Sequence, residues 1–219
     1  WWGGEVREQW QPSMKRLSTA AMALCLAGLA ALTWVQVGTW SDSYTLLGRM
    51  LKLYPDNFMA HNNLGLLQRK DGRIREAEQH FREAIRINPG FEIAYLNLGN
   101  LAKERGDADR AMEWYRQALE LNRNYAGAHL AIAGLYFERG AFSDAERHYL
   151  LATQIRPDHV AAINGLGAAL TKMNRLVEAV ALFEEALRID PGFAPARENL
   201  AAVRAAMEQT ASDLPVAQP

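Results

Sequence analysis

Residues 60–86 read AHNNLGLLQRKDGRIREAEQHFREAIR, and residues 94–120 read AYLNLGNLAKERGDADRAMEWYRQALE. The two passages begin 34 residues apart and place leucine, glycine, alanine and aromatic residues in one order, which returns twice more along the chain. The columns of equivalent positions are Pro55, Pro89, Arg123, Pro157 and Pro191; Ala60, Ala94, Ala128, Ala162 and Ala196; Leu64, Leu98, Ile132, Leu166 and Leu200; and Phe81, Tyr115, Tyr149 and Phe183. Such a period predicts an array of stacked units of one kind.

Each unit is predicted to be a pair of packed helices. A glycine inside a helix costs about 1 kcal/mol relative to alanine, so Gly65, Gly99 and Gly167 are expected where another helix approaches closely. The aromatic column is expected to fill the space between successive pairs, each burial contributing roughly 1.5 to 3 kcal/mol. Glycine and asparagine accept the positive φ that closes a helix. The positions predicted to do so are Gly72, Gly106, Gly140 and Asn174.

The ends of the second helices carry cap and turn signals. Asp109 and Ser143 are predicted to cap the helices that follow the glycine turns. The sequences Asn88-Pro89-Gly90 and Asp190-Pro191-Gly192 are predicted to stop second helices. These residues are required by the fold, so they are not interpreted as functional sites.

The spacing and pattern resemble the tetratricopeptide repeat, a helix-turn-helix unit of about 34 residues. The resemblance implies an all-α fold, a solenoid at residues 38–208 that ends in a capping helix because an uncovered last repeat would expose its apolar flank. The predicted divisions are a half repeat at 40–55, full repeats at 56–89, 90–123, 124–157 and 158–191, a cap at 193–208 and a frayed tail at 209–219.

Composition excludes several other classes of protein. The 219 residues carry a net charge of -1, which offers no general basic surface for nucleic acid. Cys25 is the only cysteine, so the chain has neither an intramolecular disulfide nor a cysteine-rich metal site.

Residues 17–37 contain no charged residue and are predicted to form a transmembrane helix after an N-terminal flank at 1–16. As a helix, this stretch is about 31 Å long, close to the hydrocarbon thickness of a bilayer. A cleaved signal peptide would have a shorter apolar core. A first repeat helix at 22–37 would fit the register, because Gly38 lies 34 residues before Gly72. Such a helix would need a polar face, which this stretch lacks.

The flanking charges predict an orientation. Lys15 and Arg16 stand directly before the apolar stretch, and only Asp42 closely follows it. The positive-inside rule then places the N-terminus in the cytoplasm and the repeats on the periplasmic or lumenal side.

A second resemblance concerns the passage that leaves this stretch. Trp34-Val35-Gln36, Trp40-Ser41-Asp42 and Pro55-Asp56-Asn57, followed by the sequence at 60–65, resemble the junction in polytopic membrane glycosyltransferases with C-terminal tetratricopeptide repeats, including transmembrane O-mannosyltransferases. The resemblance implies the C-terminal part of such an enzyme. The other membrane helices and the acidic catalytic loop of that family are absent from this sequence, so no catalytic role is transferred.

No catalytic residue, cofactor or metal site is predicted. Asp107-Ala108-Asp109 spells a metal-binding motif, but acidic residues at this position favour a helix N-terminus. His61 and His129 occupy one column and His80 and His148 another. Members of each column are two repeats apart, which is too far for a shared ion when helices pack about 8 to 10 Å apart.

The first helices are predicted to line a concave groove that binds an extended peptide. Its middle is expected to be apolar, with a hollow at Gly134. Asn63 and Asn97 resemble the asparagine ladder of the O-GlcNAc transferase repeats, interrupted at Ala131 and Gly165; ordinary solvated residues are the alternative. The predicted groove residues are Asn62, Asn63, Arg69, Asn97, Asn100, Lys103, Phe137 and Asn164.

Together these features predict a membrane-anchored repeat module that binds protein or peptide. The first hypothesis is the non-catalytic recruiting part of a membrane glycosyltransferase-like protein. The alternative is a free-standing single-span scaffold for a cell-envelope complex, and a third possibility is a soluble cytoplasmic adaptor.

Overall fold

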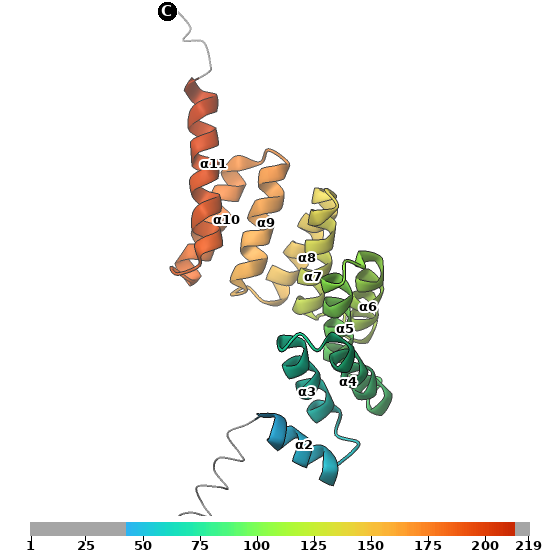
Figure 1. Cartoon of the computed structure of the whole chain (residues 1–219). Helices are drawn as coiled ribbons and strands as arrows, with labels where there is room; N and C mark the ends of the chain where they lie inside the picture. Colours follow the sequence, from blue (N-terminus) through green and yellow to red (C-terminus); the bar gives the residue numbers. More distant parts are fainter. Residues whose placement is uncertain (1–42, 213–219) are drawn as a thin grey trace, which may run out of the picture. The chain divides into compact units, whose positions relative to one another are not determined.

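The computed structural model describes residues 43–212, shown in colour in Figure 1. The predicted flank at 1–16, the predicted transmembrane helix at 17–37 and the end of the predicted tail, 213–219, lie outside this range. The chain divides into two compact units, residues 1–56 and 57–219. Helix α2 (Ser43–Leu53) is the described part of the first unit. None of the helices within residues 43–212 has both the length and the apolar composition needed to cross a bilayer.

The second unit is a run of helices in regular pairs, and residues 43–212 contain ten helices and no strand. First helices begin at residues 58, 92, 126 and 160, at the predicted interval of 34 residues. The helices are α3 (Phe58–Lys70), α4 (Ile74–Ile87), α5 (Glu92–Glu104), α6 (Ala108–Leu121), α7 (Ala126–Glu138), α8 (Phe142–Ile155), α9 (Val160–Lys172), α10 (Leu176–Ile189) and α11 (Ala194–Ser212).

The last helix, α11, continues past the predicted end of the cap at residue 208. Its sequence contains Ala205 and Ala206 and has no glycine or proline between Pro195 and Pro215, so nothing stops the helix where its apolar pattern fades. The predicted polar face is present, since Arg197, Glu198 and Arg204 are exposed.

The second unit has an inner and an outer layer. Each first helix contacts the first helix of the next repeat: α3 with α5, α5 with α7, α7 with α9 and α9 with α11. The second helices α4, α6, α8 and α10 make no such contacts with one another within this unit. The array therefore curves toward its first helices, which form the inner layer (Figure 1).

The two helices of a repeat cross where a glycine meets an aromatic ring. A Cβ atom placed on Gly65, Gly99 or Gly167 would lie 2.7, 2.3 and 2.7 Å from a ring Cε1 atom in the second helix of the same repeat. The rings are those of Phe81, Tyr115 and Phe183, and all three are fully buried. The expectation that these glycines mark a close approach between helices is confirmed.

The third repeat solves the same packing problem differently. Ala133 stands at the glycine position, and its methyl group occupies the space that the ring takes elsewhere. Tyr149 instead lies against α9 of the next repeat, where a Cβ on Gly165 would be 2.4 Å from the ring. Gly165, which interrupts the asparagine column, is thus required by the displaced tyrosine.

The helix ends confirm the predicted turns and correct the predicted caps. Gly72, Gly106, Gly140 and Asn174 all have positive φ. However, Asp107 caps α6 by accepting a hydrogen bond from the backbone N–H of Arg110 at 3.1 Å, and Ala141 occupies the N-cap of α8 without a side-chain hydrogen bond. Asp109 and Ser143 were therefore wrong as caps. Each helix begins directly after the left-handed residue, which places both side chains in its first turn.

The turns that stop second helices are confirmed. In the Asn88-Pro89-Gly90 turn, the side-chain oxygen of Asn88 accepts a hydrogen bond from the N–H of Gly90 at 3.1 Å. Asp190 accepts one from the N–H of Gly192 at 2.9 Å in the corresponding turn.

The glycine and aromatic crossing predicts a reversal of the usual effect of alanine in a helix. Gly99→Ala should destabilise the protein by about 1 to 3 kcal/mol, because the new methyl group would overlap the buried ring of Tyr115. Gly134→Ala is the matched control in α7. Its Cβ would meet only the flexible Lys103 Nζ at 3.7 Å, so it should stabilise by up to about 1 kcal/mol. Urea denaturation of both variants measures the difference, and equal midpoints would contradict this packing.

Candidate functional site

The predicted groove residues lie on α3, α5, α7 and α9, the helices of the inner layer. The structure brings some of them together across repeats. The Asn97 side-chain N–H donates to Asn62 Oδ1 at 2.8 Å, and both side chains are buried. Asn199 donates to Asn164 Oδ1 at 3.0 Å in the last repeat. These amides therefore tie neighbouring first helices together.

Two amides of the inner layer remain accessible. Asn63 is exposed, since no earlier repeat of the same unit covers it. Asn100 Oδ1 accepts a hydrogen bond from the Tyr115 hydroxyl at 2.9 Å. Its amide nitrogen has no described partner and is open to solvent, because Gln68 Oε1 is the one buried side-chain polar atom left unpaired in the described part of the chain.

The tyrosine that holds Asn100 is a firm donor. Burial raises the pKa of Tyr115 to about 12, so its hydroxyl keeps its proton at physiological pH. The aromatic residue that fills the helix crossing thus also orients a polar group on the inner surface.

The predicted basic end of the groove is neutralised by ion pairs between repeats. Arg69 binds Glu104 at 2.5 Å, and Lys103 binds Glu138 at 2.7 Å. Lys103 Nζ also lies 3.7 Å from the Cβ position of Gly134, so the lysine reaches the hollow expected there. A recess of about 320 Å³ remains between α3 and α5, lined by Leu66, Arg69, Lys70 and Glu104.

Phe137 lies in the middle of the inner layer. It is half-buried and contacts Phe142 edge to face across the turn, with ring centroids 5.4 Å apart. With Leu130 it packs against the core around Tyr149, so both predicted apolar residues are partly used by the fold.

The Asp107-Ala108-Asp109 motif uses its carboxylates within the protein. Asp107 caps α6, and Asp109 binds Arg139 of the next repeat at 2.6 Å. In the described residues no three histidine, cysteine or acidic side chains are grouped so that they could hold a metal ion.

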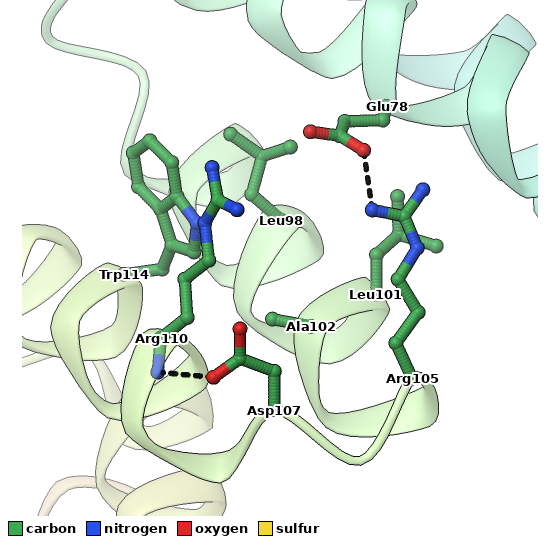
Figure 2. A pocket seen from close by; sticks show the side chains of 8 residues that line it. All are labelled: Glu78, Leu98, Leu101, Ala102, Arg105, Asp107, Arg110 and Trp114. Carbon is green, nitrogen blue, oxygen red and sulfur yellow. Dashed lines mark hydrogen bonds and ion pairs between the residues drawn. The ribbon is translucent and has the colours of Figure 1, made fainter.

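A pocket of about 240 Å³ opens between α4, α5 and α6 (Figure 2). Leu98, Leu101 and Ala102 form its apolar wall, and Trp114 lies beside it. Arg105 is neutralised by Glu78 at 2.6 Å. Arg110 has no described ion pair, and its guanidinium group extends beside the Trp114 ring in this view.

Two histidine pairs were missed by the sequence analysis. His61 Nδ1 lies 2.9 Å from His80 Nδ1, and His129 Nδ1 lies 3.0 Å from His148 Nδ1. Each pair joins the first and second helices of one repeat. The signal was the 19-residue separation, which recurs in Tyr95 with Trp114 and in Ile163 with Leu182; the sequence comparison considered only equivalent columns.

The hydrogen bonds of the second pair assign its tautomers. The carbonyl oxygen of Arg123 lies 3.0 Å from His129 Nε2 and can only accept, so this nitrogen carries a proton. In the neutral pair His129 Nδ1 then accepts from the Nδ1–H of His148. Burial, with a smaller effect of His129, lowers the pKa of His148 to about 4. Burial and His61 likewise lower the pKa of His80.

Comparisons with known proteins agree with this architecture. Family models of the tetratricopeptide repeat match residues 58–91, 102–170 and 160–193. The described solenoid is built of tetratricopeptide repeats. Comparison with curated protein sequences yields no match.

Several solved tetratricopeptide repeat structures share the fold. PilF of Pseudomonas aeruginosa is 23% identical with a TM-score of 0.65, covering 69% of each chain. YrrB, described as having an unusual peptide-binding site, is 17% identical with a TM-score of 0.59, covering 74% of this chain and 84% of its own. The first repeat domain of Spaghetti (RPAP3), bound to an HSP90 peptide, is 23% identical with a TM-score of 0.52, covering 53% and 93%.

The buried histidines predict a loss of stability in mild acid. An unfolded histidine takes up a proton near its ordinary pKa of 6.5, whereas folded His148 does so only near 4. Its contribution to stability is therefore complete above 6.5 and is lost as the pH falls from 6.5 toward 4. Because the side chain is only half-buried, solvent screening reduces the effect to about 1 kcal/mol, or roughly 2 to 4 °C in Tm.

The chain supplies a control for this pH dependence. His129→Ile with His148→Leu copies the Ile163 and Leu182 pair of the fourth repeat. Thermal melts at about pH 7.5 and about pH 5 should show a smaller acid-induced loss in the double variant than in the wild type. The same loss in both proteins would show that this pair does not resist protonation.

Proposed function

We propose that this chain is a protein-binding module whose inner layer of first helices holds an extended segment of a partner protein. The supporting observation is the continuous contact of α3, α5, α7, α9 and α11, which gives one surface along the second unit. Tetratricopeptide repeats generally serve as non-catalytic interaction scaffolds, and two of the structural neighbours are described by their peptide binding.

The polar contacts of this surface suit a peptide backbone. Asn63 and Asn100 each offer an accessible amide, which can hydrogen-bond the N–H and C=O groups of an extended strand. The ion pairs Arg69–Glu104 and Lys103–Glu138 leave the nearby surface without net charge, so we do not propose a strongly charged ligand for this face.

We further propose that the module works at a membrane, with residues 17–37 as its anchor and the repeats outside the cytoplasm. The proposal rests on the uncharged length of that stretch and on Lys15 and Arg16 before it. In this setting the module would recruit substrates or partners for a glycosyltransferase-like protein. A single-span scaffold for an envelope complex is the alternative.

The peptide-binding proposal predicts a selective effect of one exposed amide. Peptides selected from a random library against the full chain should bind Asn63→Ala more weakly, by about two- to tenfold, since a hydrogen bond contributes roughly 0.5 to 1.5 kcal/mol. Gln79→Ala, which removes an exposed amide from the outer helix of the same repeat, is the matched control. Fluorescence anisotropy measures both affinities. Equal weakening by the two variants, or by neither, would refute binding at the inner layer.

The anchor proposal predicts membrane fractionation. The full chain should stay in the membrane pellet after carbonate extraction, whereas Leu24→Lys with Leu29→Lys should release it, because each central lysine costs about 2.5 to 3.5 kcal/mol. Ser18→Lys, at the edge of the stretch, is the control and should remain in the pellet, since a lysine there can reach the interface. Wild-type protein in the carbonate supernatant would contradict the anchor.

A further inference from the structure

The outer side of the second unit carries a second cavity, between the second and third repeats. Its volume is about 720 Å³, and it extends from α6 past the start of α7 to α8. Because α6 and α8 belong to the outer layer, this cavity is separate from the inner surface proposed above. We name it the outer pocket; its lining residues are Arg116, Leu119, Glu120, Arg123, His129 and Leu151.

Two arginines of the outer pocket are free to meet a ligand. Arg116 and Arg123 are exposed, and neither forms an ion pair with a carboxylate of the described residues. Other arginines on the second helices are engaged, as Arg82 is with Glu78 and Arg188 with Glu185. Glu120 supplies the one negative charge of the lining, so the charged groups, apart from His129, sum to one positive charge.

Arg123 also breaks the strongest turn column of the sequence. Pro89, Pro157 and Pro191 occupy its position in the other repeats. Proline would be acceptable here, because no described backbone hydrogen bond uses the N–H of Arg123, while its carbonyl accepts one from His129 at 3.0 Å. The backbone of the turn is thus held as in the other repeats, and the guanidinium group is an addition that the fold does not need.

The rest of the outer pocket is apolar. Leu119 of α6 and Leu151 of α8 are half-buried, and the buried ring of His129 lies at the inner end of the lining set. A free inorganic anion would gain nothing from these surfaces, whereas an apolar side chain would bury area against them.

We propose that the outer pocket is a second docking site, and that it takes an acidic segment of a partner protein in which glutamate or aspartate flanks an aliphatic pair. The carboxylates pair with Arg116 and Arg123, and the aliphatic side chains lie against Leu119 and Leu151. Guanidinium groups suit such a ligand, because they bind carboxylates through charge-assisted and often bidentate hydrogen bonds. The site is independent of the inner layer, so the module would hold two segments at once.

The probe for this site is a fluorescein-labelled peptide, Gly-Glu-Leu-Leu-Glu-Gly, added to the purified full chain. Arg123→Pro restores the column of the other repeats, and Arg116→Glu copies Glu184 of the fourth repeat, so neither should disturb folding. Each should weaken binding by about tenfold or more, and added salt should weaken wild-type binding. Arg110→Gln, which removes the unpaired arginine of the pocket in Figure 2, should leave the affinity unchanged.

Two further peptides and one variant distinguish the outcomes. Gly-Gln-Leu-Leu-Gln-Gly should not bind, and Gly-Glu-Ser-Ser-Glu-Gly should bind at least about tenfold more weakly. Asn63→Ala should have no effect, so failure of the inner surface and failure of the outer pocket are separable. Absence of binding, unchanged affinity in Arg123→Pro, or equal binding of the serine peptide and full competition by inorganic phosphate would each overturn the proposal.

Discussion

The close approach of a glycine to an aromatic ring is the contact on which this solenoid depends. At Gly65, Gly99 and Gly167 the missing side chain admits a ring of the partner helix to within 2.3 to 2.7 Å of where a Cβ would be. Helices this close bury Ala77, Ala111 and Ala179 completely, so the small residues follow from the same constraint. The third repeat shows that the requirement belongs to the packing: when Ala133 fills the space, the ring of Tyr149 finds a glycine in the next repeat instead.

The second constraint is the stagger of neighbouring first helices. Asn62 meets Asn97, Asn164 meets Asn199, Arg69 meets Glu104, and each partner lies 35 residues further along the chain. Polar side chains on the inner layer therefore meet the column beside their own. The buried amide pair is the strongest of these links, since an unpaired buried amide would cost about 1 to 3 kcal/mol. The exposed ion pairs contribute less, because water screens them.

The sequence predicted most of the fold and less of the surface. Period, glycine column and left-handed turns were sufficient for the helix pairs, because backbone conformation and close packing depend on residue type at one position. The caps were misplaced by two residues, since Asp107 and Asp109 are equally suitable in type and only the start of the helix separates them. The histidine pairs and the Asn62–Asn97 link depend on distances between helices, which a comparison of equivalent columns does not contain.

The positions where a column breaks separate packing from binding. Ala133 and Gly165 break two columns, but they compensate one another through Tyr149, so the pair is explained within the fold. Arg123 breaks the proline column without such a partner: its backbone behaves as the proline turns do, and its side chain ends beside an apolar cavity. In a repeat protein every other unit is an internal reference for what packing requires. A departure that no neighbouring residue compensates is therefore where interaction with another molecule is the better physical explanation.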